Sequence, residues 1–303
     1  MVLIPAIDLG GTLIKGALVT PDGRVAERRS VPTGAAEGWN AVVDRMGALG
    51  RAMVQLARDH NGQAPNAIGV TVPGLLDEAT GVAIQAVNFD WTNLPIRPLL
   101  EQRIGVPIVV SHDVAAGALA EHRFGAAQGA QAAVVAPIGT GIAAGLIYRG
   151  VPYRGGHGRI VELGHVPLAW SDEPCGCGRT GCLERVASAS AIARRYARLA
   201  PAGRPALEAK DVVALALAGD PVALPVWQDA IRALGEGFAR LVTLLDPDRI
   251  VIGGGLSQAG EDLLAPLRQA IQGLLTFQVM PQVVQASLGS DAGVVGAAIG
   301  AGL

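Results

Sequence analysis

Four residues that bind metals strongly lie close together in one stretch of the chain. His165, Cys175, Cys177 and Cys182 offer one imidazole and three thiolates, a complete tetrahedral set for Zn²⁺. Glycines beside the cysteines allow the tight turns that a small metal knuckle needs. These are the only three cysteines of the chain, and an odd number argues against a disulfide framework. We therefore expect a structural zinc with no open position, in preference to three reduced cysteines without a metal.

A glycine turn near the start of the chain has the residues to bind phosphate. Asp8 is followed by Gly10, Gly11 and Thr12, and Lys15 comes three residues later. Backbone amides at glycines approach phosphate oxygens closely, Thr12 adds a hydroxyl, and Asp8 suits Mg²⁺ directly or through water. The turn joins two strands, unlike a Walker A loop or a Rossmann fingerprint. Alone it is equally typical of an ordinary hairpin, and Lys15 is equally typical of a surface lysine.

Two further glycine turns favour nucleotide binding over that alternative. Gly139, Thr140 and Gly141 stand at the equivalent point of a second strand-turn-strand pattern. Gly254 and Gly255 follow a short apolar run and precede a helix, which suits a nucleoside or its α-phosphate. Two such turns on either side of a cleft would hold a polyphosphate chain from both sides.

Carboxylates and imidazoles supply the remaining chemistry. Glu162, His165 and Glu184 offer the paired donors and acceptors that a polar ligand needs. Asp113 follows a buried-looking strand and precedes a helix. A carboxylate at the end of a strand suits a general base for a hydroxyl that attacks a γ-phosphate. From the residues alone, a helix N-cap is the favoured role for Asp113, and it is compatible with catalysis.

Hydrophobic patterning predicts the elements that position these residues. Three strands separated by turns open the chain, at Val2–Asp8, Leu13–Thr20 and Arg24–Val31. Further strands are expected at 67–72, 106–110, 132–138, 142–148, 151–153 and 250–252, and helices at 36–59, 113–123, 187–200, 208–218, 222–245, 260–274 and 293–301. The repeated strand, glycine turn and strand indicate a duplicated α/β domain, with a boundary near residue 115.

Composition excludes several classes of function. The 303 residues are half hydrophobic and carry a net charge of −2, which gives no bulk attraction to nucleic acid or anionic lipid. No apolar run is long enough to span a membrane, and the first residues lack the features of a signal peptide. We expect a cytoplasmic protein without nucleic-acid or membrane partners.

Taken in order, the motifs resemble the ROK family of sugar kinases and repressors, within the superfamily of actin, hexokinase and heat-shock ATPases. The motifs that carry the resemblance, over nearly the whole chain, are Asp8-Leu9-Gly10-Gly11-Thr12, Pro73-Gly74, His112-Asp113, Gly139-Thr140-Gly141, Glu162-Leu163-Gly164-His165, the cysteine cluster with Glu184, and Gly253-Gly254-Gly255.

The resemblance implies a two-lobed α/β fold of the actin-like ATPase type, a duplicated ribonuclease H-like fold with the active site in the interlobe cleft. The small lobe would contain 1–115 and a C-terminal helix at about 290–303, and the large lobe would contain 116–289 with the zinc site. The implied reaction is phosphorylation of a hexose by ATP and Mg²⁺, with glucose, at its 6-hydroxyl, as the leading substrate. Homodimers are common in the family.

The family pattern also implies roles for individual residues. In the kinases that this chain resembles, Glu162, His165 and Glu184 correspond to residues that contact the sugar, and zinc is bound at the cysteine cluster. Asn88 resembles the family asparagine near the sugar pocket, although a loop cap is an equal interpretation.

One departure from the family pattern concerns the residue before the catalytic base. Asp113 corresponds to that base, but the usual preceding asparagine, which contacts sugar hydroxyls, is His112 here. An imidazole still donates or accepts, with different reach and pH dependence. This difference leaves the preferred hexose open.

Alternatives remain for the function. A sugar-responsive repressor would carry a helix-turn-helix domain ahead of the first glycine motif, which begins at residue 8. A chaperone-like or filament ATPase would have no use for the zinc cluster. An N-acetylglucosamine or N-acetylmannosamine kinase would share every motif, and polyphosphate is an alternative donor to ATP.

Overall fold

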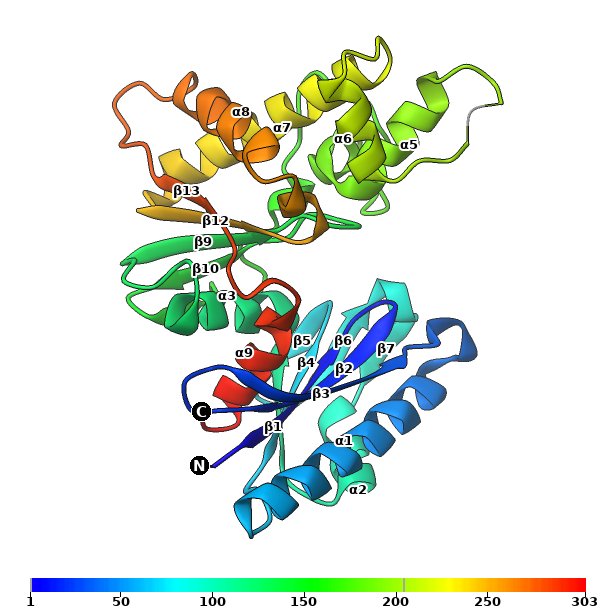
Figure 1. Cartoon of the computed structure of the whole chain (residues 1–303), viewed down its shortest axis with the longest axis vertical. Coiled ribbons are helices and arrows are strands. Elements are labelled where there is room, and N and C mark those ends of the chain that lie inside the picture. The colour runs from blue at the N-terminus through cyan, green and yellow to red at the C-terminus, as the bar shows by residue number, and fades with distance from the viewer. Residues whose placement is uncertain (1, 204) are drawn as a thin grey trace. The chain divides into compact units, whose positions relative to one another are not determined.

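The computed structural model describes residues 2–203 and 205–303 (Figure 1). Its contacts divide the chain into two compact units, and each is described by itself. The first unit comprises Met1–Gln128, Val151–Ile160 and Leu288–Leu303; the second comprises Gly129–Gly150 and Val161–Ser287. The sequence predicted a division near residue 115, whereas these contacts keep the helix that begins at Asp113 in the first unit.

The first unit contains a five-stranded sheet in the order β3-β2-β1-β4-β8. β1, β2 and β3 are antiparallel neighbours, and β4 and β8 run parallel to β1. This register places Asp8 between Lys15 and Thr71, and it places His112 opposite Val72. The strands are β1 (Ile4–Leu9), β2 (Leu13–Val19), β3 (Val25–Pro32), β4 (Ile68–Val72) and β8 (Ile108–His112).

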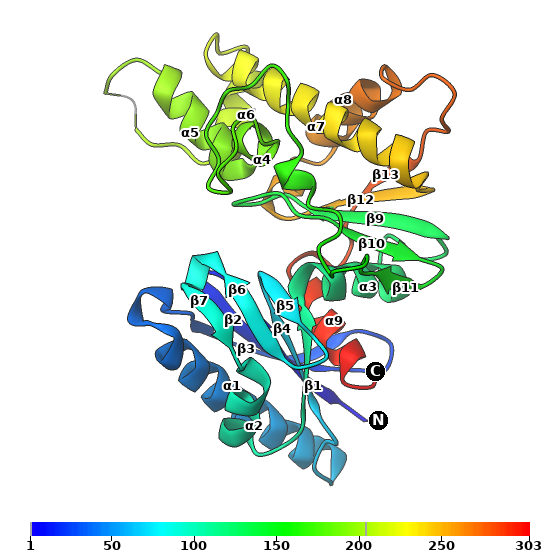
Figure 2. The ribbon, with the colours of Figure 1, turned by 180° about the vertical axis from the view of Figure 1, so that it is seen from behind.

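Helices cover both faces of this sheet (Figure 2). α1 (Trp39–Asn61) and α2 (Ile96–Ile104) pack on one face, and α1 buries Val42, Met46 and Met53 at helical spacing. α3 (Asp113–Phe124) and α9 (Ala292–Gly300) pack on the other. α9 approaches β4 so closely that a Cβ on Gly69 would lie 1.8 Å from the carbonyl oxygen of Ala297. The helix at the end of the chain therefore packs directly on the first sheet.

A second, three-stranded sheet lies in the first unit. It has the order β5-β6-β7, with β5 at Leu75–Asp77, β6 at Val82–Ala86 and β7 at Trp91–Leu94. The sequence patterns did not predict these strands, nor α2, because the strands have only three to five residues and too little alternation. Two short 3₁₀ turns, η1 (Ala35–Glu37) and η2 (Val87–Phe89), also lie in this unit before α3.

The second unit repeats the arrangement of the first. Within its sheet the order is β10-β9-β12-β13, with β9–β10 antiparallel and β12 parallel to both β9 and β13. This order matches that of the first sheet: β10 corresponds to β2, β9 to β1, β12 to β4 and β13 to β8. The match confirms the predicted duplication. The strands are β9 (Ala132–Pro137), β10 (Gly145–Tyr148), β12 (Arg249–Gly253) and β13 (Gln282–Gln285), and the short strand β11 (Val151–Tyr153) is grouped with the first unit.

Helices of the second unit gather on one side of its sheet, with α7 and α8 above β12 and β13 in Figure 1. α7 is amphipathic over its whole length, and its apolar face includes Trp227, Leu234, Phe238 and Val242. The helices are α4 (Glu184–Ala187), α5 (Ala189–Leu199), α6 (Ala209–Leu217), α7 (Ala223–Leu245) and α8 (Glu261–Gln272), with 3₁₀ turns η3 (Leu163–His165) and η4 (Gly255–Ala259); η5 (Gly289–Asp291) precedes α9 in the first unit. In the described part of the chain, no helix combines the length and apolarity that a membrane span requires.

Candidate active site and metal centre

Asp8 lies at the end of β1, immediately before the first glycine turn. Its Oδ1 accepts a hydrogen bond of 2.7 Å from the Thr71 hydroxyl, and its Oδ2 lies 4.0 Å from Lys15 Nζ. A Cβ on Gly293 would lie within 2.7 Å of the carboxyl atoms, so α9 packs against this group. Burial raises the pKa of Asp8, and the Thr71 hydrogen bond and the Lys15 charge only partly oppose that shift. A cation would therefore stabilise the ionised form.

The first glycine turn is tight and open to solvent. The Gly10 amide donates to the carbonyl of Leu13 at 3.0 Å, while Gly11 and Thr12 are exposed. Lys15 points elsewhere, because its ammonium donates to the Ser290 carbonyl at 2.9 Å. The turn thus leaves backbone at Gly11 and the Thr12 hydroxyl for a ligand, with Lys15 held at the side.

Asp113 is the first residue of α3 and directly follows β8. Its Oδ1 accepts from the Val114 amide at 2.7 Å and faces His112 Nε2 at 3.5 Å. Burial raises the pKa of Asp113; the His112 charge lowers it and the Asp8 charge raises it further. Parallel strands β1, β4 and β8 end at the same edge of the sheet, and this brings Asp8 and Asp113 into one electrostatic environment.

Asn88 lies in η2, between β6 and β7, and is exposed. Its neighbours Phe89 and Trp91 are buried with ring centroids 5.1 Å apart, which anchors the turn. The side chain of Asn88 is accessible to a ligand.

In the second unit the two glycine turns lie side by side at the end of β9 and β12. The Ile138 amide donates to the Gly253 carbonyl at 2.9 Å, and the Leu256 amide donates to the Ile138 carbonyl at 3.0 Å. Gly254 has a φ of 75°, and a Cβ there would lie 2.4 Å from the Ile138 carbonyl oxygen. Only glycine fits this position. The turn at Gly139 is fixed in addition by the Ala189 amide at the start of α5.

These turns form one wall of a cavity of about 770 Å³. Gly139, Thr140 and Gly255 belong to its lining, and the other walls come from α5, α6 and the start of α8. Its volume is typical of pockets that hold small molecules. The lining residues that sequence patterns did not indicate include Ser190, Leu207, Glu208, Lys210, Gln258 and Asp262.

The predicted metal ligands converge on one point. The ligand atoms of His165, Cys175, Cys177 and Cys182 all lie within 4.8 Å of one another. Cys177 Sγ is 3.5 Å from Cys182 Sγ, and Cys175 Sγ is 3.7 Å from His165 Nδ1. A tetrahedral zinc with bonds of about 2.3 Å to sulfur and 2.0–2.1 Å to nitrogen implies separations of about 3.6–3.8 Å. The geometry fits such an ion.

The acid–base chemistry of the thiols points the same way. Burial raises the pKa of Cys175, and burial with the two neighbouring thiols raises the pKa of Cys182 to about 12, whereas a backbone hydrogen bond from Arg179 lowers the pKa of the exposed Cys177. Three thiolates in contact are therefore unfavourable at neutral pH without a cation. A bound divalent ion would remove that penalty.

Glu184 lies beside the metal cluster, and Glu162 begins the turn that carries His165. Glu184 Oε1 is 3.8 Å from His165 Nδ1 and 3.5 Å from Cys175 Sγ. Glu162 is exposed and precedes η3. Val161 before it has a φ of 61°, a left-handed conformation that is rare for a β-branched residue and costs about 1–3 kcal/mol. The chain thus holds Glu162 in a strained backbone segment.

Glu173, which sequence patterns did not indicate, ties the cysteine loop to α5. Its side chain is buried and forms ion pairs with Arg198 and Arg195. Burial alone would raise the pKa of Glu173, but the Arg198 hydrogen bond and the nearby arginine charges bring it below its usual value. The sequence signal, an acid before the first cysteine and three arginines in one helix, is too common to identify the contact.

Comparison with known proteins agrees with these features. The model of the ROK family matches residues 4–301. A glucokinase of Halalkalibacterium halodurans is 34% identical over 310 residues, which cover 96% of this chain and 92% of that protein.

Solved structures show the same fold. The chain is similar to a ROK hexokinase from Thermus thermophilus, with 35% identity, a TM-score of 0.83, and 98% and 97% of the two chains covered. It is also similar to a ROK family glucokinase from Streptomyces griseus in complex with glucose and AMPPNP, with 33% identity, a TM-score of 0.84 and 98% of each chain covered. The two α/β units have the actin-like ATPase fold of these kinases, and the chain belongs to the ROK family.

Proposed function

We propose that this protein is a sugar kinase that transfers the γ-phosphoryl group of ATP to a hexose hydroxyl, with glucose as the leading substrate and its 6-hydroxyl as the acceptor. The observation that carries the proposal is the carboxylate of Asp113 at the end of β8, with its pKa raised by burial. The glucokinase names of relatives that match along nearly their full length support the choice of substrate.

Asp113 is the proposed catalytic base. When it is ionised, a carboxylate with a raised pKa is a stronger proton acceptor than an ordinary surface aspartate. It would accept the proton of the sugar hydroxyl as the oxygen attacks the γ-phosphorus in line. The proton then resides on Asp113 until the product leaves and solvent removes it.

Asp8 and the glycine turns are the proposed site of the phosphates. Asp8 would hold Mg²⁺ directly or through water, because its partly buried carboxylate has only the partial charge compensation of Lys15. Mg²⁺ would neutralise charge that develops on the phosphates. Gly10, Gly11 and Thr12 in the first unit, and Gly139, Thr140 and Gly141 in the second, offer backbone and hydroxyl donors to phosphate oxygens.

ATP is favoured over polyphosphate as donor because of the 770 Å³ cavity beside Gly139 and Gly255. Its lining includes the apolar side chains of Leu207, Val213 and Leu256. A polyphosphate chain has no apolar part to bury in such a cavity, whereas a nucleoside has. Gly254 and Gly255 would then lie near the nucleoside and its α-phosphate.

Sugar specificity is assigned to polar side chains of both units. Glu162, His165 and Glu184 would bind hydroxyls, with Asn88, His112 and Asp113 completing the set. His165 serves two roles at once, because a metal on Nδ1 leaves Nε2 for the sugar. An N-acetylhexosamine remains the second candidate substrate, since the same residues would hold its ring hydroxyls.

Zinc is the proposed occupant of the Cys₃His cluster, in a structural role. It would fix His165 and the neighbouring Glu184. Cys177→Ser should abolish stoichiometric zinc in purified protein, measured by elemental analysis, and should lower the melting temperature and the sugar affinity. Retained zinc would contradict this ligand assignment.

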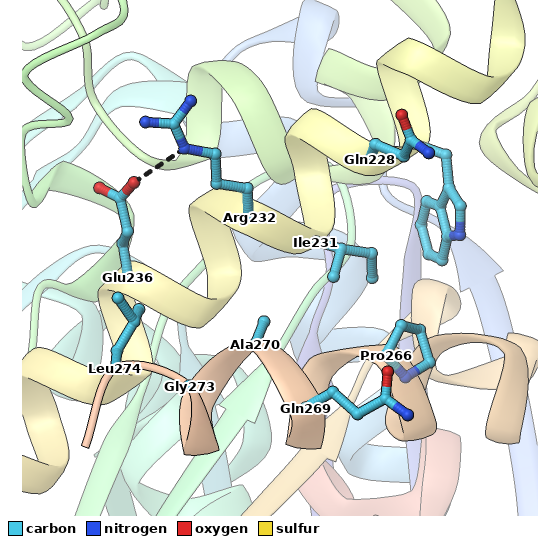
Figure 3. A pocket seen from close by; sticks show the side chains of 10 residues that line it. Gln228, Ile231, Arg232, Glu236, Pro266, Gln269, Ala270, Gly273 and Leu274 are labelled. Carbon is cyan, nitrogen blue, oxygen red and sulfur yellow. Dashed lines mark hydrogen bonds and ion pairs between the residues drawn. The ribbon is translucent and has the colours of Figure 1, made fainter. Parts of the chain in front are cut away.

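A homodimer is proposed from the outer face of α7 and α8. Leu244 near the end of α7 is largely exposed, as are Phe277 and Val279 in the segment after α8, where Leu274 is half-exposed. A neighbouring groove of about 560 Å³, shown in Figure 3, has Ile231, Ala270 and Pro266 in its walls. A second copy would bury this apolar surface. Light scattering at several concentrations should give twice the chain mass of 30.9 kDa, and Phe277→Glu should reduce it to that of the single chain.

An ADP-release screen tests the proposed function. Purified protein should release ADP from ATP and Mg²⁺ with glucose, and more slowly with mannose, fructose, N-acetylglucosamine or N-acetylmannosamine. A parallel arm replaces ATP by polyphosphate and measures sugar phosphate directly. Turnover only with an N-acetylhexosamine would select the second candidate, and no turnover with any of these sugars would overturn the kinase assignment. We place the activity in the cytoplasm, where ATP is available and the three free cysteines remain reduced.

A further inference from the structure

Glu78 contacts the polypeptide immediately before the proposed base. Its Oε1 accepts a 2.7 Å hydrogen bond from the backbone amide of His112. Its Oε2 lies 2.7 Å from Arg154 Nη2, so one carboxylate joins two segments of the first unit. The turn that carries Glu78 is itself fixed, because Asp77 Oδ1 accepts from the amides of Ala79 and Thr80. The end of β8 is thus held from outside its own sheet.

The two ring nitrogens of His112 have different partners. Nδ1 accepts from the backbone amide of Ala115 at 3.4 Å and so caps the N-terminus of α3. In the neutral ring the proton must then be on Nε2, because Nδ1 acts as the acceptor. Nε2 lies 3.5 Å from Asp113 Oδ1. The helix cap therefore selects the tautomer that turns an N–H toward the base.

These contacts make the two oxygens of Asp113 unequal. Oδ1 accepts from the Val114 amide at 2.7 Å and faces His112 Nε2. The hydrogen bond from Val114 and the contact with His112 thus both fall on Oδ1. Oδ2 is the oxygen on which neither of these contacts falls.

We propose that Glu78 and His112 are positioning residues that hold Asp113 with Oδ1 bound by the protein and Oδ2 presented to the sugar hydroxyl. This inference rests on the kinase function proposed above and deepens it. Glu78 fixes the backbone before the base, and His112 orients the carboxylate. His112 thus contributes to the sugar site proposed above through the carboxylate that it orients.

Several charged groups surround Asp113 and enter any measurement of its titration. They are His112 on β8, Asp8 on β1, Lys15 on β2 beside Asp8, and Glu78 with Arg154 behind the His112 backbone. Variants that change one of these groups have to be compared with the wild type under the same buffer conditions.

The test compares Glu78→Ala with Glu101→Ala. Glu101 is a matched control because its Oε1 accepts a 3.3 Å hydrogen bond from the Ile108 amide, at the opposite end of β8 from Asp113. Glu78→Ala should lower kcat by about ten-fold or more and change the glucose KM by less than about three-fold, since a small displacement of a base slows the reaction strongly. Glu101→Ala should lower the melting temperature but leave kcat unchanged.

Two further variants separate positioning from direct sugar binding. Glu78→Gln keeps an acceptor for the His112 amide and should recover most of the lost kcat. His112→Asn keeps a good helix cap but removes the imidazole, so the acid limb of kcat/KM should move to higher pH by about 0.5 unit or more.

Three outcomes would overturn the inference: equal kcat losses in Glu78→Ala and Glu101→Ala, a change in glucose KM alone, or an unmoved acid limb in His112→Asn. Because the wild type is assayed beside each variant, an inactive wild type would instead identify a failure of the proposed kinase function itself.

Discussion

The turn between β1 and β2 and the turn that follows β9 occupy equivalent positions in two sheets of the same strand order, yet their surroundings differ. Counting back from the first glycine of each turn, Asp8 in the first corresponds to Pro137 in the second. Asp8 has a partly buried carboxylate that accepts a hydrogen bond from Thr71. The second turn has no acid at that point but borders a large cavity.

The difference shows that the same backbone turn is surrounded by different functional groups in the two units. In both units a strand ends in glycines that leave backbone amides accessible. The first unit adds carboxylates at the ends of its parallel strands, Asp8 on β1 and Asp113 after β8. The second unit adds Gly254 after β12 and the helices that enclose the cavity. We interpret the first unit as the side of the base and of Mg²⁺, and the second as the side of the nucleoside.

The largest effect on kcat is expected when Asp8 loses its charge, and the equivalent position of the second unit, Pro137, provides the control. Asp8→Asn should lower kcat by about 10²-fold or more, because it removes the charge proposed to hold Mg²⁺ near the phosphates. Pro137→Ala is the matched change in the second unit and should leave kcat within about two-fold. Steady-state assays with varied Mg²⁺ measure both, and similar losses in both variants would remove the proposed division.

A smaller effect, confined to the donor side, is expected at Gly254. Gly254→Ala should raise the KM for ATP and lower stability by about 1–3 kcal/mol, because an added Cβ meets the Ile138 backbone at a φ of 75°. Gly62→Ala is the control, since Gly62 has a φ of 72° with open space around it. The glucose dissociation constant should stay unchanged in both variants; a weaker affinity for glucose in Gly254→Ala would count against the nucleoside assignment.

The smallest effect on catalysis is expected at the anchor of the metal loop. Glu173→Gln should lower the free energy of unfolding by about 1–3 kcal/mol and accelerate zinc release to a chelator, because the buried carboxylate holds the loop through Arg195 and Arg198. Glu261→Gln breaks an exposed pair with Arg268 and should cost less than about 1 kcal/mol. Equal zinc release rates in these two variants would show that the anchor has no role in metal retention.

The sequence predicted elements best where their patterns are long. Helices such as α1 and α7, with 23 residues each, show clear helical spacing, and the two strand-turn-strand repeats have glycines at fixed points. β5, β6 and β7 were missed because three to five residues give too little alternation. β13 was missed because a four-residue strand owes its identity to its pairing with β12.

The candidate site was predictable where local spacing carries the chemistry. The four metal ligands converge because their short loops leave few other arrangements. Contacts between distant segments had no such signal, because each depends on how separate elements pack. They are the hydrogen bond from Thr71 to Asp8, the hydrogen bond from the His112 amide to Glu78, and the ion pair between Glu173 and Arg198 of α5. A single Thr or Glu in a sequence gives no indication of such a partner.

The most direct test of the division of roles is Asp113→Asn, with glucose affinity, turnover and thermal stability measured on one preparation. Burial raises the pKa of Asp113, so the folded protein prefers the neutral carboxyl and its ionised form costs stability at neutral pH; the melting temperature should therefore not fall. By calorimetry the glucose dissociation constant should stay within a few-fold of the wild-type value, while kcat falls by about 10²-fold or more. In the wild type, kcat/KM should decline as the pH falls through this raised pKa. Near-normal turnover in Asp113→Asn, in protein that binds glucose normally, would contradict the account.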